Sequence, residues 1–595
     1  MTSHRRVARV YVCAGALVLG VAFHVSAQVT TGTLVGGVTD PTGQPLTHAE
    51  IRVSDDLHHV ARTVMTDDAG LYRVVDLPPA SYGVSATATG FAQQVRRDVR
   101  IPVDSTVRVD FQLPVAAIAQ TVDVTGAAGV VQTTSGGLGA VLDRSRIETL
   151  PLNRRDSLQL ALLTPGIEGP VENSELSDRG GIAMHANGAR EEFNNFLLDG
   201  VDNNDVYVNR YVVQPSVDSV QEFKVATNSY SAEYGRSAGG QVNVITRSGT
   251  SQLQGFGYEY FRNRALDAAN YFEDGTQPYS RNQFGGGIGG PLVKDRTFFF
   301  GTLDLLRERE GLSQLSTVPT AADRAGVVPG AVDPFTGQPF PGGIIPANRI
   351  SPIARQIIGL FPLANQSGPA NYLGQPVQTD NDTEGMIRID HRWSNADRLI
   401  MRYSGGGADL FEPYAEGQAN TTTDGFGDFV TDRTWNLTGQ HEHVWGRATN
   451  SLRFGANRFR RDVLTQNYTT NVGAAWGVNW LNVPSQSFGY PLIQVAGFSK
   501  VGDPYSLPIL RTASTYQIAD DLTIDRGAHL FKIGGDTRYL QLDSQLDLFS
   551  RGQLSFTGAL TGSGMGDLLL GLPTLGIQSQ ANNPIHMRTN EWSAY

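Results

Sequence analysis

Residues 387–403 read Ile-Arg-Ile-Asp-His-Arg-Trp-Ser-Asn-Ala-Asp-Arg-Leu-Ile-Met-Arg-Tyr, and this stretch decides the fold class. Apolar or aromatic side chains stand at Ile387, Ile389 and Trp393, and the alternation resumes after the tight-turn sequence 394–397. Successive side chains of a β-strand point to opposite faces, so one face here is apolar and the other is polar. The stretch therefore predicts an antiparallel strand pair with lipid on one face and an aqueous lumen on the other.

The same pattern continues over residues 251–595, where the predicted connections are of two kinds. Short turns are predicted near residues 291–296, 394–397, 446–449 and 525–528. Long polar loops are predicted near residues 263–281, 312–382, 405–431, 461–514 and 545–587. Short and long connections alternate, as periplasmic turns and extracellular loops do in transmembrane β-barrels.

The composition favours an all-β-dominated chain. Glycine accounts for 67 of the 595 residues, which suits a fold with many turns. The formal net charge of −11 excludes a strongly basic surface for nucleic acid. After Ala27 no apolar run reaches the ~18 residues that a membrane-spanning helix needs.

The N-terminus has the pattern of a signal peptide over residues 1–27. Basic residues precede the apolar run 10–23, and Val25-Ser26-Ala27 offers the small side chains that signal peptidase requires. The single cysteine, Cys13, lies inside this segment. Once the segment is removed, disulfides and cysteine-ligated metal sites are excluded.

Residues 28–115 are predicted to form a small β-sandwich of about seven short strands separated by turns. Asp67-Asp68-Ala69-Gly70 is predicted to close a hairpin. The stretches that carry a resemblance are 37–45 (GVTDPTGQP), 66–72 (TDDAGLY) and 77–82 (LPPASY). They resemble the carboxypeptidase regulatory-like domain, a transthyretin-like sandwich with a carbohydrate-binding-like fold. No peptidase is implied, because the region lacks the metal ligands and general base in motif form.

A second series of motifs lies in residues 128–250. In order along the chain these are LPLNRR (150–155), LALLTPG (160–166), NGAR (187–190), NNFLLDGVD (194–202), VQEFKV (220–225), SAEYGR (231–236) and GGQVNVIT (239–246). The series resembles the plug of Oar-like TonB-dependent receptors. The resemblance implies an α+β plug, followed over residues 251–595 by the N-terminal part of an antiparallel outer-membrane β-barrel.

The linker 116–127 contains a candidate TonB box, the segment through which such receptors engage TonB. Its residues are Thr121, Val122, Asp123, Val124 and Thr125. A TonB box must be extended and accessible, so that it can add a strand to the edge of a partner's sheet. An ordinary strand is the alternative interpretation, and the position between sandwich and plug favours the TonB box.

Candidate substrate-binding residues lie at the apices of the plug. They are Asn194, Asp199, Asp202 and Asn204. Their surroundings also fit an Asx-rich turn or, with less support from the spacing, a calcium site. Four plug arginines either pair with acidic residues of the barrel wall or bind a ligand: Arg154, Arg155, Arg190 and Arg236. His441 and His443 share a strand face, but two histidines alone do not specify a metal site.

We expect a receptor in the outer membrane, with its sandwich in the periplasm. The resemblance implies active uptake of a solute, driven through TonB by a proton-powered motor of the inner membrane. No catalytic residue, cofactor, metal or nucleic-acid partner is expected, and glycans, peptides and metal chelates all remain possible solutes. The alternatives are a carbohydrate-binding or adhesin-like surface protein without transport and, with little support, an enzyme.

The strand count also leads to an expectation about completeness. We count about nine barrel strands and the start of another at 587–595, whereas receptors of this type have barrels of ~22 strands. We therefore expect the chain to be a C-terminally truncated receptor that neither closes nor transports alone. Thr589, Glu591 and Ser593 share the face of Tyr595, and this polar face is predicted to point inward.

Signal peptidase is expected to cleave after Ala27 and leave Gln28 as the first residue, because the small side chains at Val25-Ser26-Ala27 fit its site. N-terminal sequencing of the protein from outer membranes measures this directly. A mature protein that still contains Cys13 would contradict the prediction.

Overall fold

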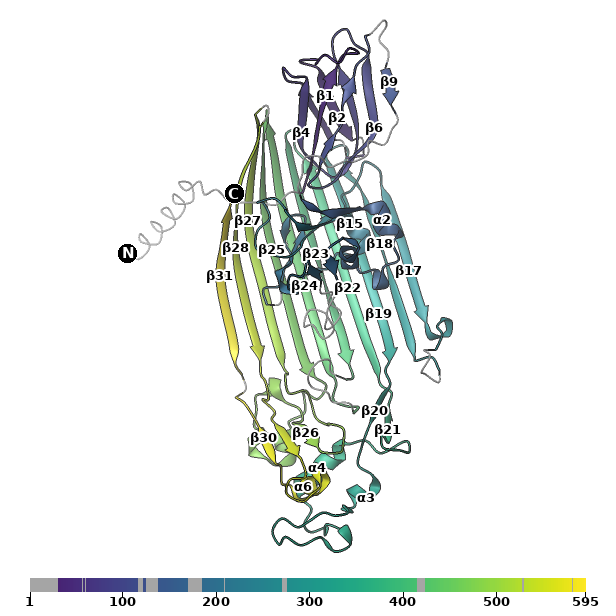
Figure 1. Cartoon of the computed structure of the whole chain (residues 1–595), viewed down its shortest axis with the longest axis vertical. Coiled ribbons are helices and arrows are strands. Elements are labelled where there is room, and N and C mark those ends of the chain that lie inside the picture. The colour runs from purple at the N-terminus through teal and green to yellow at the C-terminus, as the bar shows by residue number, and fades with distance from the viewer. Residues whose placement is uncertain are drawn as a thin grey trace, which may run out of the picture.

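The computed structural model describes residues 30–55, 57–58, 60–115, 121–124, 137–169, 184–207, 209–269, 275–414, 423–526, 529–580 and 582–595. A small sandwich lies over one end of a tall curved sheet, a second domain lies against the inner face of that sheet, and long connections gather at its other end (Figure 1). The predicted signal peptide lies outside the described residues. None of the helices in the described part is long and apolar enough to cross a membrane.

The N-terminal sandwich consists of two facing sheets. One contains β1 (Gly32–Thr39), β4 (Leu71–Leu77), β7 (Thr106–Arg108) and β8 (Phe111–Gln112). The other contains β2 (Glu50–Asp55), β3 (Val60–Met65), β5 (Ala80–Thr87), β6 (Gln93–Ile101) and β9 (Thr121–Val124). Alternate residues such as Leu34, Ile51 and Val84 are fully buried between the sheets. This alternation explains why a region of short strands forms a stable core.

The predicted hairpin at Asp67–Gly70 is wrong. Strands β3 and β4 flank these residues but belong to different sheets, so the turn carries the chain across the sandwich. The turn itself forms: the Asp67 carboxylate accepts bonds from the N–H groups of Ala69 and Leu71, and Gly70 has φ +70°. Turn residues specify the reversal but not the sheet that the next strand joins.

The second domain has a five-stranded mixed sheet within the described residues. Its order is β10 (Leu138–Asp143), β15 (Val220–Asn228), β16 (Gln241–Thr246), β13 (Asn195–Leu198) and β14 (Val201–Asp202). Short helices and a two-stranded ladder surround it: α2 (Arg144–Thr149), η1 (Asn153–Arg155), η2 (Ser157–Leu163), η4 (Glu191–Phe193), η5 (Val217–Ser219), β11 (Ile167–Glu168) and β12 (His185–Ala186). Leu160, Leu198, Phe223 and Val242 form part of its core.

The tall sheet has ten strands among the described residues, and each neighbouring pair is antiparallel. They are β17 (Gln254–Asn263), β18 (Tyr279–Val293), β19 (Thr297–Gly311), β22 (Val377–Arg392), β23 (Asp397–Glu412), β24 (Asp428–Trp445), β25 (Ala448–Thr465), β27 (Ile509–Arg526), β28 (His529–Leu546) and β31 (Pro584–Ala594). The predicted fold class, with its partial antiparallel barrel, is confirmed.

The two faces of the sheet differ as the sequence predicts. On the outer face Ile387 and Trp393 are 51% and 57% exposed, whereas Arg388 and Asp390 on the inner face are almost fully buried. In β31, Glu591 pairs with Arg236 of the second domain, and the Tyr595 hydroxyl donates to Asp521 of β27. The face shared by Glu591 and Tyr595 therefore points inward, as predicted.

Strand lengths differ from the prediction. Strands β24, β25, β27 and β28 have 18 residues each, and they extend by two to six residues into the predicted loops. Crossing the hydrocarbon core takes only ~9–11 residues. The remaining residues extend the wall beyond the membrane, where the lipid-facing alternation no longer marks them as strands.

The long connections are also more structured than predicted, because they pack into a cap with its own hydrophobic core. Its elements are β20 (Gln314–Ser316), α3 (Ala321–Arg324), η7 (Pro341–Gly343), α4 (Pro352–Leu360), β21 (Tyr372–Gly374), α5 (Val472–Trp476), η8 (Asn479–Leu481), η9 (Ser485–Ser487), β26 (Leu492–Val495), β29 (Gln553–Phe556), α6 (Gly564–Leu570) and β30 (Leu575–Ile577). A short helix, η6 (Arg264–Leu266), follows β17. Val318, Ile357, Ile493 and Leu568 come from three different connections and are buried together.

Candidate functional site

The second domain contacts the wall through a tight hairpin between β13 and β14. Leu198 pairs with Val201, so Asp199 and Gly200 form a two-residue turn. Both have positive φ, +52° and +71°, as the favoured type I′ hairpin turn requires. Gly455 of β25 makes room for this hairpin, because a Cβ there would lie 2.2 Å from Val201 Cγ1.

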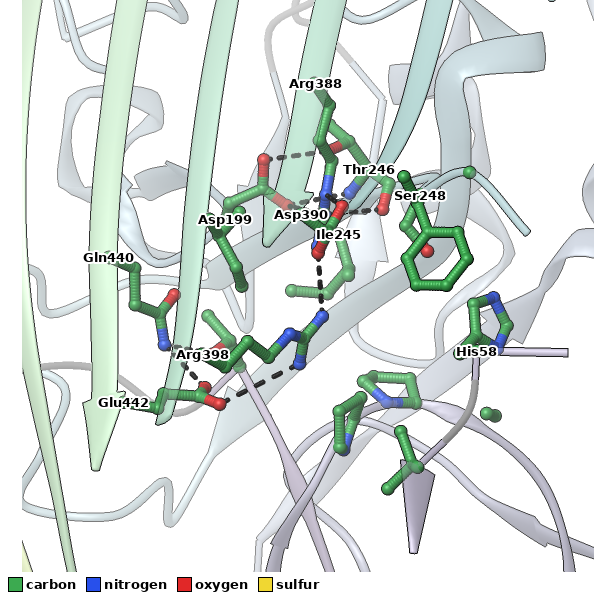
Figure 2. A pocket seen from close by; sticks show the side chains of 18 of the residues that line it. His58, Asp199, Ile245, Thr246, Ser248, Arg388, Asp390, Arg398, Gln440 and Glu442 are labelled. Atoms are coloured by element: carbon green, nitrogen blue, oxygen red, sulfur yellow. Dashed lines mark hydrogen bonds and ion pairs between the residues drawn. The ribbon is translucent and has the colours of Figure 1, made fainter. Parts of the chain in front are cut away.

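The carboxylate of Asp199 joins the hairpin to strand β22 through Arg388 (Figure 2) and to strand β23 through Arg402. Arg402 Nε donates to Asp199 Oδ2 at 3.0 Å, and Arg388 Nη1 lies 3.4 Å from Oδ1. Within the domain, Thr246 donates its N–H to Oδ1 at 2.9 Å and its hydroxyl to Oδ2 at 2.8 Å. All four residues are buried, and Arg388, the most accessible of them, is only 5% exposed. The charge of this buried carboxylate is thus fully compensated.

Asp202, on the strand that follows the turn, is also held by two arginines. Its Oδ2 accepts bonds of 2.9 Å from Arg236 of the domain and from Arg538 of β28. Burial alone would raise the pKa of Asp202, but the two guanidinium groups together with hydrogen bonds from Asn204 outweigh burial and lower the pKa. Asn436 and Asn457 of the wall donate to its main-chain oxygen at 3.0 and 2.9 Å.

The other two predicted substrate residues are bonded inside the domain. Asn194 Nδ2 donates to Met184 O at 2.7 Å, and its Oδ1 accepts from Gly240 N. Asn204 Nδ2 donates to Asn195 Oδ1 at 2.8 Å. The structure therefore brings the four residues to one hairpin and its surroundings, where their side chains bond to other groups of the protein. A role in binding solute stays a prediction. No group of three or more potential metal ligands occurs among the described residues.

Two of the four arginines pair with acidic residues of the wall, as one interpretation predicts. Arg154 pairs with Asp380 of β22, and Arg236 pairs with Glu591 of β31. Arg155 instead pairs with Asp218 of its own domain, and it donates to the Tyr260 hydroxyl of β17. Arg190 is exposed.

Cavities lie on both sides of the hairpin. The larger, about 300 Å³, faces the cap and is lined by residues 153–156 and 210–216 and by the wall carboxylates Asp304, Asp382 and Glu384. The smaller, about 70 Å³, lies beside the sandwich (Figure 2). The sequence contained a signal for the larger one, because Asp380, Asp382 and Glu384 alternate at strand spacing. Most of that stretch falls in the predicted loop 312–382.

The sandwich is attached to strand β15 of the second domain. Arg100 pairs with Asp143 and Glu222, and the Val103 N–H donates to Glu222 Oε2 at 2.7 Å. Asp104 pairs with Lys224. Burial raises the pKa of Glu222, and this rise is only partly offset by the Val103 N–H and Arg100. These contacts fix the sandwich against the second domain, which packs on the inner face of the wall.

The candidate TonB box is partly described. Residues Thr121–Val124 form β9, which pairs in parallel with β6 from Gln93↔Thr121 to Arg96↔Val124. Thr125 lies outside the described residues. The segment is extended, which both the TonB box and the ordinary strand require.

Comparison with known proteins identifies the family. Residues 245–595 match the model of the outer membrane beta barrel domain, which is more than half of the chain. The chain belongs to this family. Residues 33–114 of this outer-membrane protein match the carboxypeptidase regulatory-like domain, which confirms the resemblance of the sandwich.

The TonB-dependent transporter Oar of Myxococcus xanthus is 28% identical over 298 residues, which are 47% of this chain and 27% of that protein. The chain thus spans well under two thirds of that curated relative. Among solved structures, the outer membrane transporter YddB from Escherichia coli has a TM-score of 0.47 and 10% identity, covering 77% of this chain and 53% of the other. For the siderophore receptor PiuA from Acinetobacter baumannii the values are 0.41, 12%, 77% and 61%. These relatives are transporters and receptors rather than enzymes.

Replacing Arg402 with alanine should destabilise the protein strongly. Asp199 would lose the better of its two arginines while staying buried, and breaking a buried ion pair from one side costs about 3–5 kcal/mol. The free energy of unfolding, from urea titration of the full-length receptor in detergent, measures the effect. Arg433→Ala is the control, because Arg433 and Asp409 form a well-exposed pair and should contribute little. Equal effects of the two variants would contradict the assignment.

Asp156, which lines the larger cavity, should make stability depend on pH. Burial raises its pKa to about 7, although the Leu158 N–H and Arg154 favour the charged form. An unfolded chain loses this proton near pH 4, so the folded state binds more protons between about pH 4 and 7, and stability falls as pH rises through that window. Asp156→Asn can still accept the Leu158 N–H but cannot ionise.

The measurement is the urea midpoint of both proteins from pH 4 to pH 8. The variant should be more stable than the wild type at pH 8, and the two midpoints should converge near pH 4. Parallel profiles over the whole range would show that Asp156 is not the titrating group.

Proposed function

We propose that the protein is a TonB-dependent receptor that takes up a solute actively across the outer membrane. The observation that carries the proposal is a folded domain, fixed by buried ion pairs, against the inner face of a barrel wall. A wide barrel without such a plug would leak. The similarity to the transporter Oar supports the same function.

In this proposal the domain boundaries are those predicted from the sequence. The sandwich is 28–115, the linker with the TonB box is 116–127, the plug is 128–250 and the barrel begins at 251. The sandwich lies in the periplasm, and the cap of long connections faces the outside. The short turns beside the sandwich and the long connections at the opposite end support this orientation (Figure 1).

The solute first meets the cap and then the larger cavity, whose carboxylates and arginines offer polar contacts. Asp199 and Asp202 contact the solute only after the hairpin leaves the wall, because wall arginines hold both carboxylates in the closed state. Asn194 and Asn204 contact the solute only if their bonds within the domain also open. A proton-driven motor supplies the energy through TonB, which pairs with residues 121–125. Glycans, peptides and metal chelates are candidate solutes.

Proline at Val122 tests the coupling. It removes a main-chain N–H that strand pairing uses, so uptake by the full-length receptor should fall to the background of cells without TonB. Binding of solute at the cell surface should persist, because the cap and the larger cavity are unchanged. Val122→Ala keeps the N–H and should transport normally.

Normal uptake by the proline variant would refute the TonB box. If the wild type also binds solute at the surface but does not take it up, the adhesin-like alternative is favoured. The compact cap, with its own hydrophobic core, is the feature that such a display protein would use.

A further inference from the structure

The two cavities lie along the same three strands of the wall. Cap-side cavity residues are Glu384 of β22, Gly406 of β23 and Thr434 of β24. Sandwich-side cavity residues are Arg388, Ile400 and Gln440, from the same strands in the same order. At about 3.3 Å per residue, the separation is roughly 13 Å along β22, from Glu384 to Arg388, and roughly 20 Å along β23 and β24. The layer of protein between the cavities is therefore thinnest at β22.

That layer is a belt of hydrogen bonds between the hairpin and the wall. Arg402 donates to Asp199 Oδ2 at 3.0 Å and to Leu198 O at 3.1 Å. Asn436 donates to Asp202 O at 3.0 Å, and Arg388 donates to Thr246 O at 2.9 Å. These four side chains, and the residues whose three main-chain oxygens accept from them, are buried, so the belt excludes water between the cavities.

We propose that the solute passes along the inner face of β22, β23 and β24, and that Asp199 closes this route. The inference rests on the proposed function and adds the location of the path and of its gate. Asp199 lines the sandwich-side cavity and binds one arginine on each of β22 and β23. Withdrawal of this one carboxylate opens the belt where the two cavities are nearest.

The arrangement can open without leaving its charged groups bare of hydrogen-bond partners. Arg388 keeps a two-bond contact with Asp390 of its own strand, at 2.9 and 3.0 Å. Arg402 keeps Asn436 O, the Thr438 hydroxyl and Ser404 on the wall. On the plug side, Asp199 keeps both bonds from Thr246. Each partner therefore has a second set of contacts, as a reversible gate requires, because an unpaired buried ion is strongly unfavourable.

The chain offers a matched control at a different part of the wall. Glu233 of the plug is also buried and also pairs with a wall cation, Lys532 of β28, at 3.0 Å. It lines neither of the two cavities. Neutralising Glu233 therefore weakens plug–wall contact without touching the proposed route.

The test measures ion conductance of the purified full-length receptor in planar lipid bilayers, without TonB. The wild type should be closed, Asp199→Asn should conduct at least ~10-fold above the wild-type baseline, and Glu233→Gln should stay closed. Thr246→Val, which removes one bond to Asp199 but keeps the side-chain shape, should also raise the conductance, but less than Asp199→Asn does.

Heat-modifiable migration on gels shows which variants are folded. If Asp199→Asn does not fold, Thr246→Val decides.

A thiol at Ser248 locates the path, because Ser248 lines the sandwich-side cavity (Figure 2) and the only cysteine of residues 1–595, Cys13, lies in the predicted signal peptide. A maleimide added from the cap side should block the conductance of Asp199→Asn/Ser248→Cys by at least half.

Equal conductance of Asp199→Asn and Glu233→Gln would mean a generally loosened plug, and it would overturn the proposal. Closed Asp199 and Thr246 variants, or a conductance that the maleimide does not affect, would also overturn it. Because these measurements do not involve TonB, they stand apart from the uptake test of Val122.

Discussion

Two buried carboxylates on one hairpin, Asp199 and Asp202, hold the plug in the wall. Each has two arginine partners, and each is far too buried to stay charged without them. The wall arginines of Asp199 lie on β22 and β23, whereas the wall arginine of Asp202 lies on β28, with three strands between β23 and β28. The hairpin must therefore sit at one position to satisfy both carboxylates. The pairs therefore specify where the plug sits, even though a buried ion pair adds little net stability over an apolar contact.

The alternating pattern of residues 387–403 was sufficient to predict the wall and its lipid face, and the polar residues Thr589, Glu591 and Ser593 indicated the inward face of the last strand. Each of these follows from the period of two in a strand. The same rule could not give the strand ends, because beyond the membrane both faces of a strand meet water and the alternation disappears. The cap was missed for a related reason: its core is assembled from four distant connections, and the only extended amphipathic helix among the described ones is the short α4.

The site was predictable in its location but not in its contacts. The motif around Asp199-Gly200 marks a tight turn, and the structure has one. That the Asp199 and Asp202 carboxylates would meet arginines more than 180 residues away depends on the closed arrangement of plug and wall. The error at Asp67–Gly70 has the same origin, since the sheet that a strand joins is decided by long-range packing rather than by the turn.

The pairing of β9 with β6 has a mechanical consequence. The two strands run in parallel over four paired positions. A pull along the axis of β9 would load these positions together, and all of their hydrogen bonds would have to fail at once. A pull away from the sheet edge would separate them one after another at much lower force. The direction in which a partner draws on this strand therefore determines whether the sandwich resists the load or lets the strand go.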